Sequence, residues 1–394
     1  MIDKPLLAAV MVLLTLSMVM SYSLSTYTVL YFHFDDLHFF LRQSISIFVA
    51  FTAMVFLSRL DPDKWFSRVG LTLFFTFFIL MIAMQFMPAS LVKAVGGAKR
   101  WIHLGPISLA PVEFFKVGFV FFLSWSFARK FSKRKQTGFI EEIKSFMPYI
   151  VVFLIAVIII AVFQKDLGQV VVLGGTLMVM FLFVGSSWKF FLTMLTGIFA
   201  AFIGLIFFAP HRMARIKSWW STVQDSILSL LPFKQLETLR VATTAKEPYQ
   251  ISNSLNAIHN GGFWGQGLGN GQFKLGYLSE VHTDFILAGI TEELGYVGLV
   301  FVTMTILFIV FRIFKIASKV KDPMYYLFSI GVGLLIAFAF ILNSYGISGI
   351  TPIKGIAVPF LSYGGSHIIA ACVAIGMVLM VSKKVPRDRE GKML

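Results

Sequence analysis

Cysteine is almost absent from this chain. Its 394 residues include one, Cys372, which lies inside an apolar run near the C-terminus. A single cysteine cannot form an intrachain disulfide, and its surroundings indicate neither a thiolate metal site nor redox chemistry. The sequence therefore speaks against a small domain held together by disulfides.

Charged residues are also scarce. They make up 13% of the chain, against 57% hydrophobic residues, whereas soluble domains carry about 25% charge. Many windows reach the roughly 20 apolar residues that cross a bilayer core. Because these runs are continuous rather than alternating, they favour helices. We predict an all-α polytopic membrane protein, a bundle of about ten transmembrane helices. The predicted spans are Leu6–Ser25, Ser44–Leu60, Val69–Phe86, Ala110–Ala128, Met147–Phe163, Val170–Gly185, Phe190–Ala209, Leu294–Phe311, Tyr325–Leu342 and Ser366–Val381.

Acidic residues are outnumbered, since 34 Lys and Arg face 19 Asp and Glu, and the net charge is +15. The basic residues gather in alternate short loops, such as 129–135 and 383–392, and are sparse in the loops between. This asymmetry predicts that both termini are cytoplasmic. It also explains the basic balance without nucleic acid as a partner, because no basic patch lies apart from the membrane edges.

One large segment, residues 210–283, separates the seventh and eighth predicted spans and lies outside the cytoplasm in this topology. It is too short to build a core of its own, so we predict a single membrane domain over residues 1–394. Its first part, Ser218–Leu239, mixes aromatic, leucine and polar residues. That mixture favours a helix in the membrane interface, with Trp219 and Trp220 at headgroup depth. An irregular loop is the alternative.

Glycine is concentrated in two places. Seven glycines fall within residues 261–276, but no Gly-Lys-Ser/Thr follows, which speaks against a nucleotide P-loop. Tight turns with positive φ are the expected structure. The second cluster, Pro359–Ser366, interrupts a helical pattern. Irregular backbone at membrane depth is tolerated only against protein or a polar cavity, so this segment is expected to face the bundle interior.

Polar residues inside apolar spans need a physical reason, because each charge costs roughly 2.5–3.5 kcal/mol at a helix centre. Glu113 and Lys116 are three residues apart in the fourth span, on one helix face. Either an internal ion pair that fixes the bundle or the lining of a polar cavity would explain them. Asp166, in a short outer turn, is expected to cap the sixth span.

Acidic residues also gather before the eighth span. Asp284 is expected outside the hydrocarbon, with Glu292 and Glu293 near its upper edge. Glu280 and Asp284 are four residues apart, and two neighbouring carboxylates raise the pKa of one of them, which suits a general base. Capping of the helix N-terminus by these acids is the alternative.

Several cations are expected on the same outer side. One carboxylate among several cations suits a phosphate-bearing substrate, in which the cations hold a diphosphate and the carboxylate removes a proton. For Arg212 and Arg215, contact with lipid headgroups is the alternative. The outer cations are Lys99, Arg100, Arg212, Arg215 and Lys354.

Longer motifs, in the same order over nearly the whole chain, resemble the SEDS proteins, the FtsW/RodA/SpoVE family. The lysine in Pro352-Ile353-Lys354-Gly355 is closer to the division branch of that family than to the elongation branch. The other motifs that carry the resemblance are Gly97-Ala98-Lys99-Arg100-Trp101-Ile102, Pro111-Val112-Glu113-Phe114-Phe115-Lys116, Gln164-Lys165-Asp166-Leu167-Gly168, Arg212-Met213-Ala214-Arg215-Ile216, Tyr249-Gln250, Gly261-Gly262-Phe263-Trp264-Gly265-Gln266-Gly267, Glu280-Val281-His282-Thr283-Asp284-Phe285-Ile286, Glu292-Glu293-Leu294-Gly295 and Pro359-Phe360-Leu361-Ser362-Tyr363-Gly364-Gly365-Ser366.

The resemblance implies a peptidoglycan glycosyltransferase that polymerises lipid II at the outer face of the bacterial cytoplasmic (inner) membrane during septal wall synthesis. The essential aspartate of the family falls on Asp284, which would deprotonate the acceptor sugar hydroxyl while undecaprenyl diphosphate leaves. The residues implied in substrate binding are Lys99, Arg100, Glu113, Lys116, Arg212, Arg215, Glu280, His282, Lys354 and Ser362.

The resemblance implies partners but no certain cofactor. It implies a class B penicillin-binding transpeptidase, other division proteins and surrounding membrane lipids, and it leaves open a divalent cation, Mg²⁺ or Mn²⁺. An elongation polymerase and a lipid II flippase remain alternative functions, as does a scaffold that recruits division proteins. The chain departs from the family pattern at Lys165 and Ser279, where proline is usual, and at Ala110-Pro111-Val112.

Overall fold

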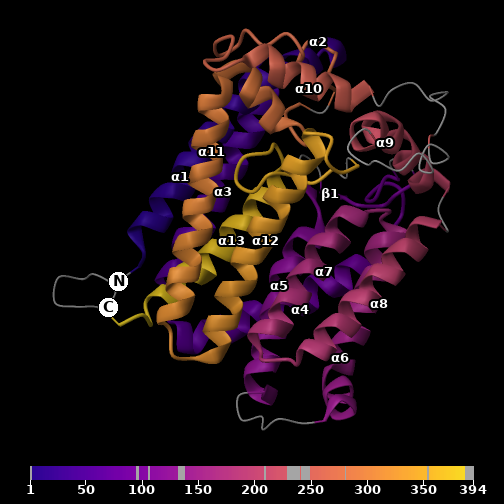
Figure 1. The fold of residues 1–394 in the computed structure, drawn as a ribbon. Helices are drawn as coiled ribbons and strands as arrows, with labels where there is room; N and C mark the ends of the chain where they lie inside the picture. The colour runs from indigo at the N-terminus through magenta and orange to yellow at the C-terminus, as the bar shows by residue number, and fades with distance from the viewer. Residues whose placement is uncertain are drawn as a thin grey trace.

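The computed structural model describes residues 2–94, 97–104, 107–131, 138–207, 210–228, 240, 249–279, 281–352 and 355–386. Figure 1 shows a bundle of long helices that run roughly side by side. Its long helices are α1 (Lys4–Leu24), α3 (His38–Arg59), α4 (Pro62–Ala83), α5 (Pro111–Phe131), α6 (Phe139–Val157) with its π-helical continuation η1 (Ile158–Phe163), α7 (Leu167–Phe183), α8 (Trp188–Phe207), α11 (Ile286–Lys319), α12 (Pro323–Ile347) and α13 (Gly365–Ser382).

The predicted all-α membrane bundle is confirmed. Among the described residues, nine helices are long and apolar enough to span a membrane. The remaining predicted span coincides with α7, which is apolar but only 17 residues long. One small element was not expected, a hairpin of β1 (Ile102–Leu104) and β2 (Ile107–Leu109) in which Ile102 pairs with Leu109.

Three helices begin with the same local signal, an aspartate followed within two residues by proline. In α1, α4 and α12 the side chains of Asp3, Asp61 and Asp322 accept hydrogen bonds from backbone N–H groups of the first turn. Proline fits there because its missing N–H would have no helical partner. These are the first, third and ninth predicted spans, so they start from the same side of the membrane.

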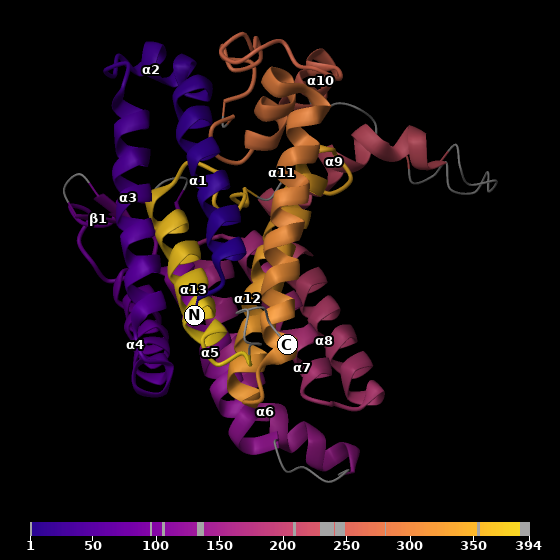
Figure 2. The same cartoon turned by 90° about the vertical axis from the view of Figure 1, so that its left-hand side faces the viewer.

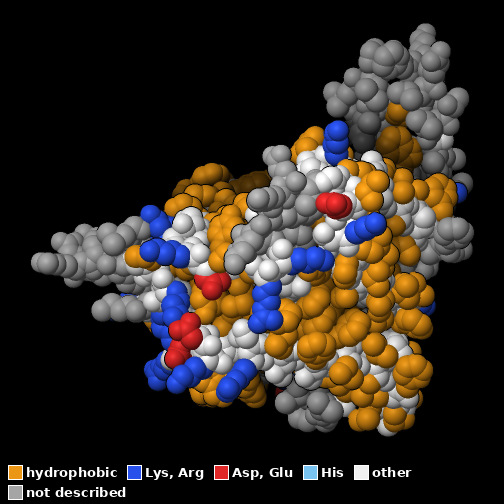
Figure 3. Space-filling model, turned by 90° about the horizontal axis from the view of Figure 1, so that it is seen from below, with side chains coloured by type: hydrophobic (Ala, Val, Ile, Leu, Met, Phe, Trp, Pro, Cys, Tyr) orange, Lys and Arg blue, Asp and Glu red, His pale blue; other side chains and the backbone are white. Residues whose placement is uncertain are grey.

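The two chain ends meet at that side. The backbone N–H of Asp3 donates to Ser382 Oγ at 3.1 Å, and Arg312 Nη2 lies 2.5 Å from Asp3 Oδ2. A common end for both termini is what an even number of membrane crossings requires. Seen from below, this end shows many Lys and Arg side chains and few acids (Figure 3), among them the exposed Lys64, Arg68 and Lys321. The distribution matches the charge asymmetry on which the topology was predicted.

The core lies around α13, which packs against α3, α5 and α12. Aromatic side chains fill the spaces between helices, as where Phe66 meets Tyr325 and Phe328 edge to face. Elsewhere backbones touch directly. A Cβ on Gly118 of α5 would lie 2.4 Å from the backbone nitrogen of Phe74 in α4. Large apolar side chains also face outward, such as Phe199 of α8 at 63% exposure, which is the expected lipid-facing surface.

The opposite end of the bundle carries the shorter elements. These are α2 (Thr26–Phe32), the hairpin, α9 (Pro210–Leu228), α10 (Tyr249–Gly261) and the glycine-rich loop that follows it. The helix expected over Ser218–Leu239 is present but begins earlier, at Pro210, and residues 229–239 lie outside the described residues. Figure 2 shows α9 extending sideways from the bundle. Trp219 Nε1 donates to the Gly349 carbonyl at 2.7 Å, which ties α9 to the loop after α12.

Candidate functional site

Asp284 lies in a turn directly before α11, between buried side chains that hold the turn down. Its neighbours Val281 and Phe285 are each 2% exposed, while Asp284 itself is half-buried. It borders a cleft of about 10 Å³ that is also lined by residues of the last turns of α12 and by Gly355 and Ile356. A volume of that size holds roughly one water molecule.

The far wall of the cleft is a backbone segment that can approach Asp284 only at a glycine. Gly355 has φ of +61°, and a Cβ there would lie 3.0 Å from Asp284 Oδ2. Asn343 of α12 joins the two walls, because its Nδ2 donates to the carbonyls of Asp284 at 2.7 Å and Ile356 at 2.6 Å. The backbone that carries the Asp284 carboxylate is therefore fixed to α12 and to the segment that contains Ile356.

His282 and Ser362, both predicted to bind substrate, lie close to Asp284, His282 in the same turn and Ser362 in a segment that contacts this turn. Ser362 Oγ donates to the Thr283 carbonyl at 2.7 Å and accepts from the backbone N–H of Val358 at 2.8 Å. The His282 carbonyl accepts from Tyr363 N at 2.9 Å. In the described contacts these two residues fasten the turn to residues 355–363. A role in substrate binding stays a prediction for both.

The segment Pro359–Ser366, which was expected to face the bundle interior, is irregular up to Gly364, and α13 begins at Gly365. Burial confirms the expectation. Val358, Phe360, Leu361 and Ser362 are fully buried, and Phe360 has a positive φ of 64°. We call residues 355–363, which approach Asp284 at Gly355, the platform.

The Glu113–Lys116 pair is present and buried, with Lys116 Nζ 2.9 Å from Glu113 Oε2. Gln169 of α7 connects both members, since it donates to Glu113 at 2.9 Å and accepts from Lys116 at 2.7 Å. His367 Nδ1 of α13 lies 3.0 Å from Glu113 Oε2, and its Nε2 lies 3.4 Å from the Val358 carbonyl. Of the two explanations left open by the sequence, these contacts favour an internal network that fixes α5, α7 and α13 and supports the platform.

Lys99 and Arg100 are engaged in backbone contacts away from the cleft. Lys99 Nζ donates to the Gln85 carbonyl at 2.8 Å. Arg100 donates to the carbonyls of Gln164 at 2.7 Å and Lys165 at 3.0 Å. Asp166 caps α7 as expected, because it accepts from Gln169 N at 3.2 Å. No described contact joins Lys99 or Arg100 to Asp284, and their binding of a diphosphate remains a prediction.

The other predicted site residues fall partly outside the description. Arg212 and Arg215 lie on α9, but their side chains are not among the described atoms. Glu280 and Lys354 lie outside the described residues. In the sequence, Glu280 lies four residues before Asp284, and Lys354 directly precedes Gly355. Asp284 and Gly355 both line the cleft.

Glu292 and Glu293 are fully buried and organise the glycine-rich loop. Glu293 accepts from Lys274 Nζ at 2.7 Å and from Ser23 Oγ at 2.6 Å. Glu292 Oε1 accepts from the backbone N–H of Gln272 at 2.6 Å. The loop turns as predicted, with positive φ at Gly262, Gly265, Gly267, Gly269 and Gly276.

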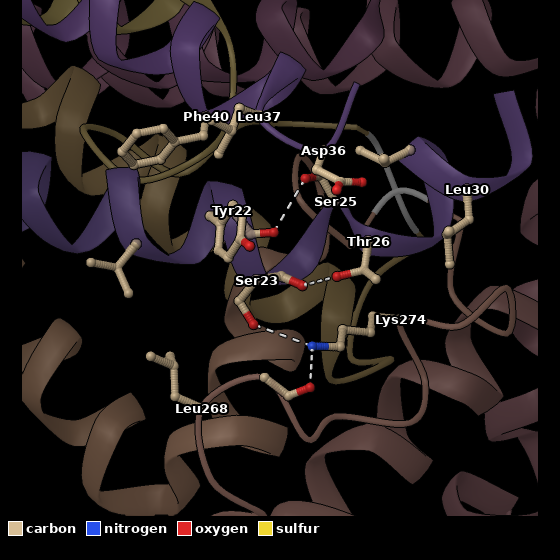
Figure 4. A pocket seen from close by; sticks show the side chains of 13 residues that line it. Tyr22, Ser23, Ser25, Thr26, Leu30, Asp36, Leu37, Phe40, Leu268 and Lys274 are labelled. Atoms are coloured by element: carbon tan, nitrogen blue, oxygen red, sulfur yellow. Dashed lines mark hydrogen bonds between the residues drawn. The ribbon is translucent and has the colours of Figure 1, made fainter. Parts of the chain in front are cut away.

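Lys274 also borders a larger cavity of about 520 Å³ between α1, α2, the start of α3 and the glycine-rich loop. In Figure 4 its ammonium points toward Ser23 and the Gly269 carbonyl. The remaining lining is mostly apolar, including Leu30, Phe40 and Leu268. Asp284 does not line this cavity, so the cavity and the cleft are separate features.

Gly295 is a point where the loop and α11 depend on glycine. It has φ of 70° and ψ of −173° inside α11, and a Cβ there would lie 2.2 Å from the Phe263 carbonyl oxygen. We expect Gly295→Ala to destabilise the protein by more than the roughly 1–3 kcal/mol of backbone strain alone. The measurement is thermal unfolding in detergent.

Gly197→Ala is the matched control, because a Cβ at Gly197 of α8 meets nothing within 4 Å. Alanine in a helix is favoured over glycine by about 0.5–1 kcal/mol. Equal melting temperatures for the two variants would contradict the role given to Gly295.

Sequence reasoning missed Asn343, Lys274, Gln169 and His367. Gln169, Asn343 and His367 are polar residues within or beside an apolar run, which is the kind of residue that needs a partner at membrane depth. Lys274 lies in the glycine-rich loop. The partners themselves, such as Asn343 with Asp284, are far apart in the chain. The described residues contain no group of three or more His, Cys, Asp or Glu placed to hold a metal ion.

A family model described as "Cell cycle protein", covering FtsW, RodA and SpoVE, matches residues 4–386. The chain is 48% identical over 382 residues to the probable peptidoglycan glycosyltransferase FtsW of Helicobacter pylori strain 26695, covering 97% of this chain and 98% of that protein. It is 32% identical over 387 residues to the stage V sporulation protein E of Bacillus subtilis, covering 97% of each.

Solved structures agree in fold. The rod shape determining protein RodA of Thermus thermophilus matches with a TM-score of 0.65 at 20% identity, over 97% of both chains. A chain of a peptidoglycan synthase complex, described as coordinating polymerization and crosslinking, matches with a TM-score of 0.69 at 21% identity, over 97% of this chain and 98% of that one. With the family match over nearly its whole length, this multi-pass membrane protein belongs to the FtsW/RodA/SpoVE family, the SEDS proteins.

Proposed function

We propose that this chain is a peptidoglycan glycosyltransferase that polymerises lipid II, with Asp284 as the general base. The observation that carries the proposal is the placement of Asp284, a half-buried carboxylate fixed by backbone contacts in a cleft at one end of the bundle. A base must be held within hydrogen-bond reach of the proton that it removes. The name of the Helicobacter pylori relative supports the same reaction class.

In the proposed reaction, the Asp284 carboxylate takes the proton of a hydroxyl on the acceptor sugar. That oxygen forms a bond to the anomeric carbon of the donor sugar as the bond to the lipid diphosphate breaks. The diphosphate leaves with the bonding electrons, and nearby cations stabilise its charge. Lys354, which precedes Gly355 in the sequence, and Arg212, which lies on α9, are the candidates, and their roles are part of the proposal.

We place the protein in the bacterial cytoplasmic (inner) membrane, with the Asp284 end outside. The basic character of the opposite end supports this orientation. A class B penicillin-binding transpeptidase is the proposed partner, in line with the described coordination of polymerization and crosslinking in the matched complex. Other division proteins and membrane lipids complete the proposed surroundings. The identity to FtsW favours septal synthesis over elongation.

The resemblance left open a divalent cation, Mg²⁺ or Mn²⁺. The described residues contain no group of three or more His, Cys, Asp or Glu placed to hold one. The described residues therefore do not fit a resident metal, and we derive no step from one. A cation carried by the substrate diphosphate is compatible with the proposal, since hard cations prefer phosphate and carboxylate oxygen.

The test is a polymerisation assay. The full chain is purified with its transpeptidase partner and given labelled lipid II in detergent. Glycan strands are then resolved by length. We expect strands from the wild-type complex. Absence of strands, together with transfer of labelled lipid II between the leaflets of vesicles, would contradict the proposal and favour the flippase.

A further inference from the structure

Asn343 lies on the last turns of α12, is 5% exposed, and lines the same cleft as Asp284. Its Nδ2 donates to two carbonyl oxygens, those of Asp284 and Ile356, at 2.7 and 2.6 Å. A carbonyl oxygen can only accept, so both contacts require the NH₂ side of the amide. The orientation of the amide group is therefore settled by its partners.

The other half of the amide is unused. Asn343 Oδ1 is buried and has no hydrogen-bond partner among the described residues. A buried amide oxygen without a donor is costly, and such atoms in native proteins call for a ligand, a water or an ion. Because the amide cannot turn over without losing two short hydrogen bonds, and no described residue offers a donor, a bound ligand is the donor that we consider.

The surroundings restrict what that donor can be. Apart from Asp284 and Asn343, the described side chains that line the cleft are apolar, namely Phe285, Leu342, Ile347 and Ile356. The two polar groups, an ionised carboxylate and an amide oxygen, are both acceptors. The cleft therefore favours a group that carries O–H or N–H donors, and its volume of about 10 Å³ admits hydroxyl groups rather than a whole sugar ring. A sugar with neighbouring hydroxyls meets this requirement.

We propose that Asn343 is a substrate-binding residue whose Oδ1 accepts a hydrogen bond from the acceptor sugar. The proposal rests on the proposed function. The hydroxyl that attacks gives its single proton to Asp284, so Asn343 must bind a second donor of the same sugar, a neighbouring hydroxyl. Two acceptors and two donors fix both the position and the rotation of the sugar.

The first measurement compares Asn343→Leu, which is similar in size but has no amide, with the wild type and with Ser344→Ala. Ser344 is half-buried on the same helix turn and does not line the cleft. With the transpeptidase partner and lipid II, we expect Asn343→Leu to lower kcat/KM for polymerisation about 10- to 100-fold. This is the loss typical of a buried polar group, here the sugar hydroxyl, that is left without its hydrogen-bond partner. We expect Ser344→Ala to leave it unchanged. Wild-type kcat/KM in Asn343→Leu would overturn the proposal.

The second measurement separates contact with substrate from support of the backbone. Acceptor analogues that each lack one hydroxyl of the acceptor sugar are given to the wild type and to Asn343→Leu. If Asn343 binds one of these hydroxyls, one analogue is poor for the wild type, while the variant uses that analogue and the natural acceptor equally well. If every analogue loses the same factor with both proteins, Asn343 only supports the backbone and the proposal is wrong.

Asn343→Ser serves where Asn343→Leu does not fold, because serine retains one donor for the Asp284 or Ile356 carbonyl. Thermal unfolding reports the folded state of each variant. Failure of this inference is distinct from failure of the proposed function. If the wild type makes no glycan strands, the function itself is wrong; if the wild type makes strands but shows no coupling between analogue and variant, only the role of Asn343 is wrong.

Discussion

Asp284→Asn is expected to abolish glycan-strand formation while the protein remains folded. An amide cannot take up the proton of the acceptor hydroxyl, and a positioned general base contributes typically 10²–10⁴-fold to rate. The fold should survive because the described contact of Asp284 with Asn343 uses the Asp284 backbone carbonyl, which the substitution keeps. The measurement is the rate of lipid II polymerisation by the purified complex, with thermal unfolding recorded beside it.

Asp166→Asn is the matched control for this variant. Asp166 is also a carboxylate beside a short loop. It caps α7 and lies 3.9 Å from Arg100, and asparagine caps helices as well as aspartate does. We expect it to keep most of the wild-type rate. If Asp284→Asn polymerises lipid II at more than about a tenth of the wild-type rate, Asp284 is not the base.

The membrane helices were predictable because their signal is local. A run of apolar residues longer than the bilayer core needs no knowledge of its neighbours, and Asp-Pro pairs mark the starts of α4 and α12 within the sequence itself. The boundaries of α11 were not predictable in the same way. The span expected over Leu294–Phe311 belongs to a helix that runs over Ile286–Lys319.

The reason lies in tertiary contacts of Glu292 and Glu293. By composition they should end an apolar helix, but both are buried in it. Lys274, Ser23 and backbone N–H groups of the glycine-rich loop satisfy their charges. These partners come from a different helix and from a loop of irregular conformation. Periodicity holds no information on such pairings.

In the candidate site, too, residues marked by a local sequence pattern were predictable, and residues whose role depends on tertiary contacts were not. Asp284 was identified from the motif around it, and the platform 355–363 from its glycine and proline pattern. The place of Asn343 was not identified, because its meaning depends on Asp284, 59 residues away. For Lys99 and Arg100, the structure shows contacts with the carbonyls of Gln85 and Gln164 that the sequence did not indicate. Their contact with a diphosphate stays a prediction.

Lys116→Met is expected to lower the stability of the protein strongly. It leaves Glu113, which is 8% exposed, with Gln169 and His367 as its remaining described partners. Removal of one member of a buried ion pair costs about 3–5 kcal/mol, because the other charge stays buried and uncompensated. The expected results are a lower melting temperature in detergent and a lower yield from the membrane.

The double variant Glu113→Gln, Lys116→Met tests this reason directly. It removes both charges while glutamine can still hydrogen-bond to Gln169 and His367, so it should recover much of the stability lost in Lys116→Met. Recovery would mean that the pair acts as a unit that holds α5 to α7 and α13 beneath the platform. A Lys116→Met protein with wild-type melting temperature but no polymerisation would contradict this. The ammonium group would then belong to the path of the substrate, the reading that the sequence alone left open.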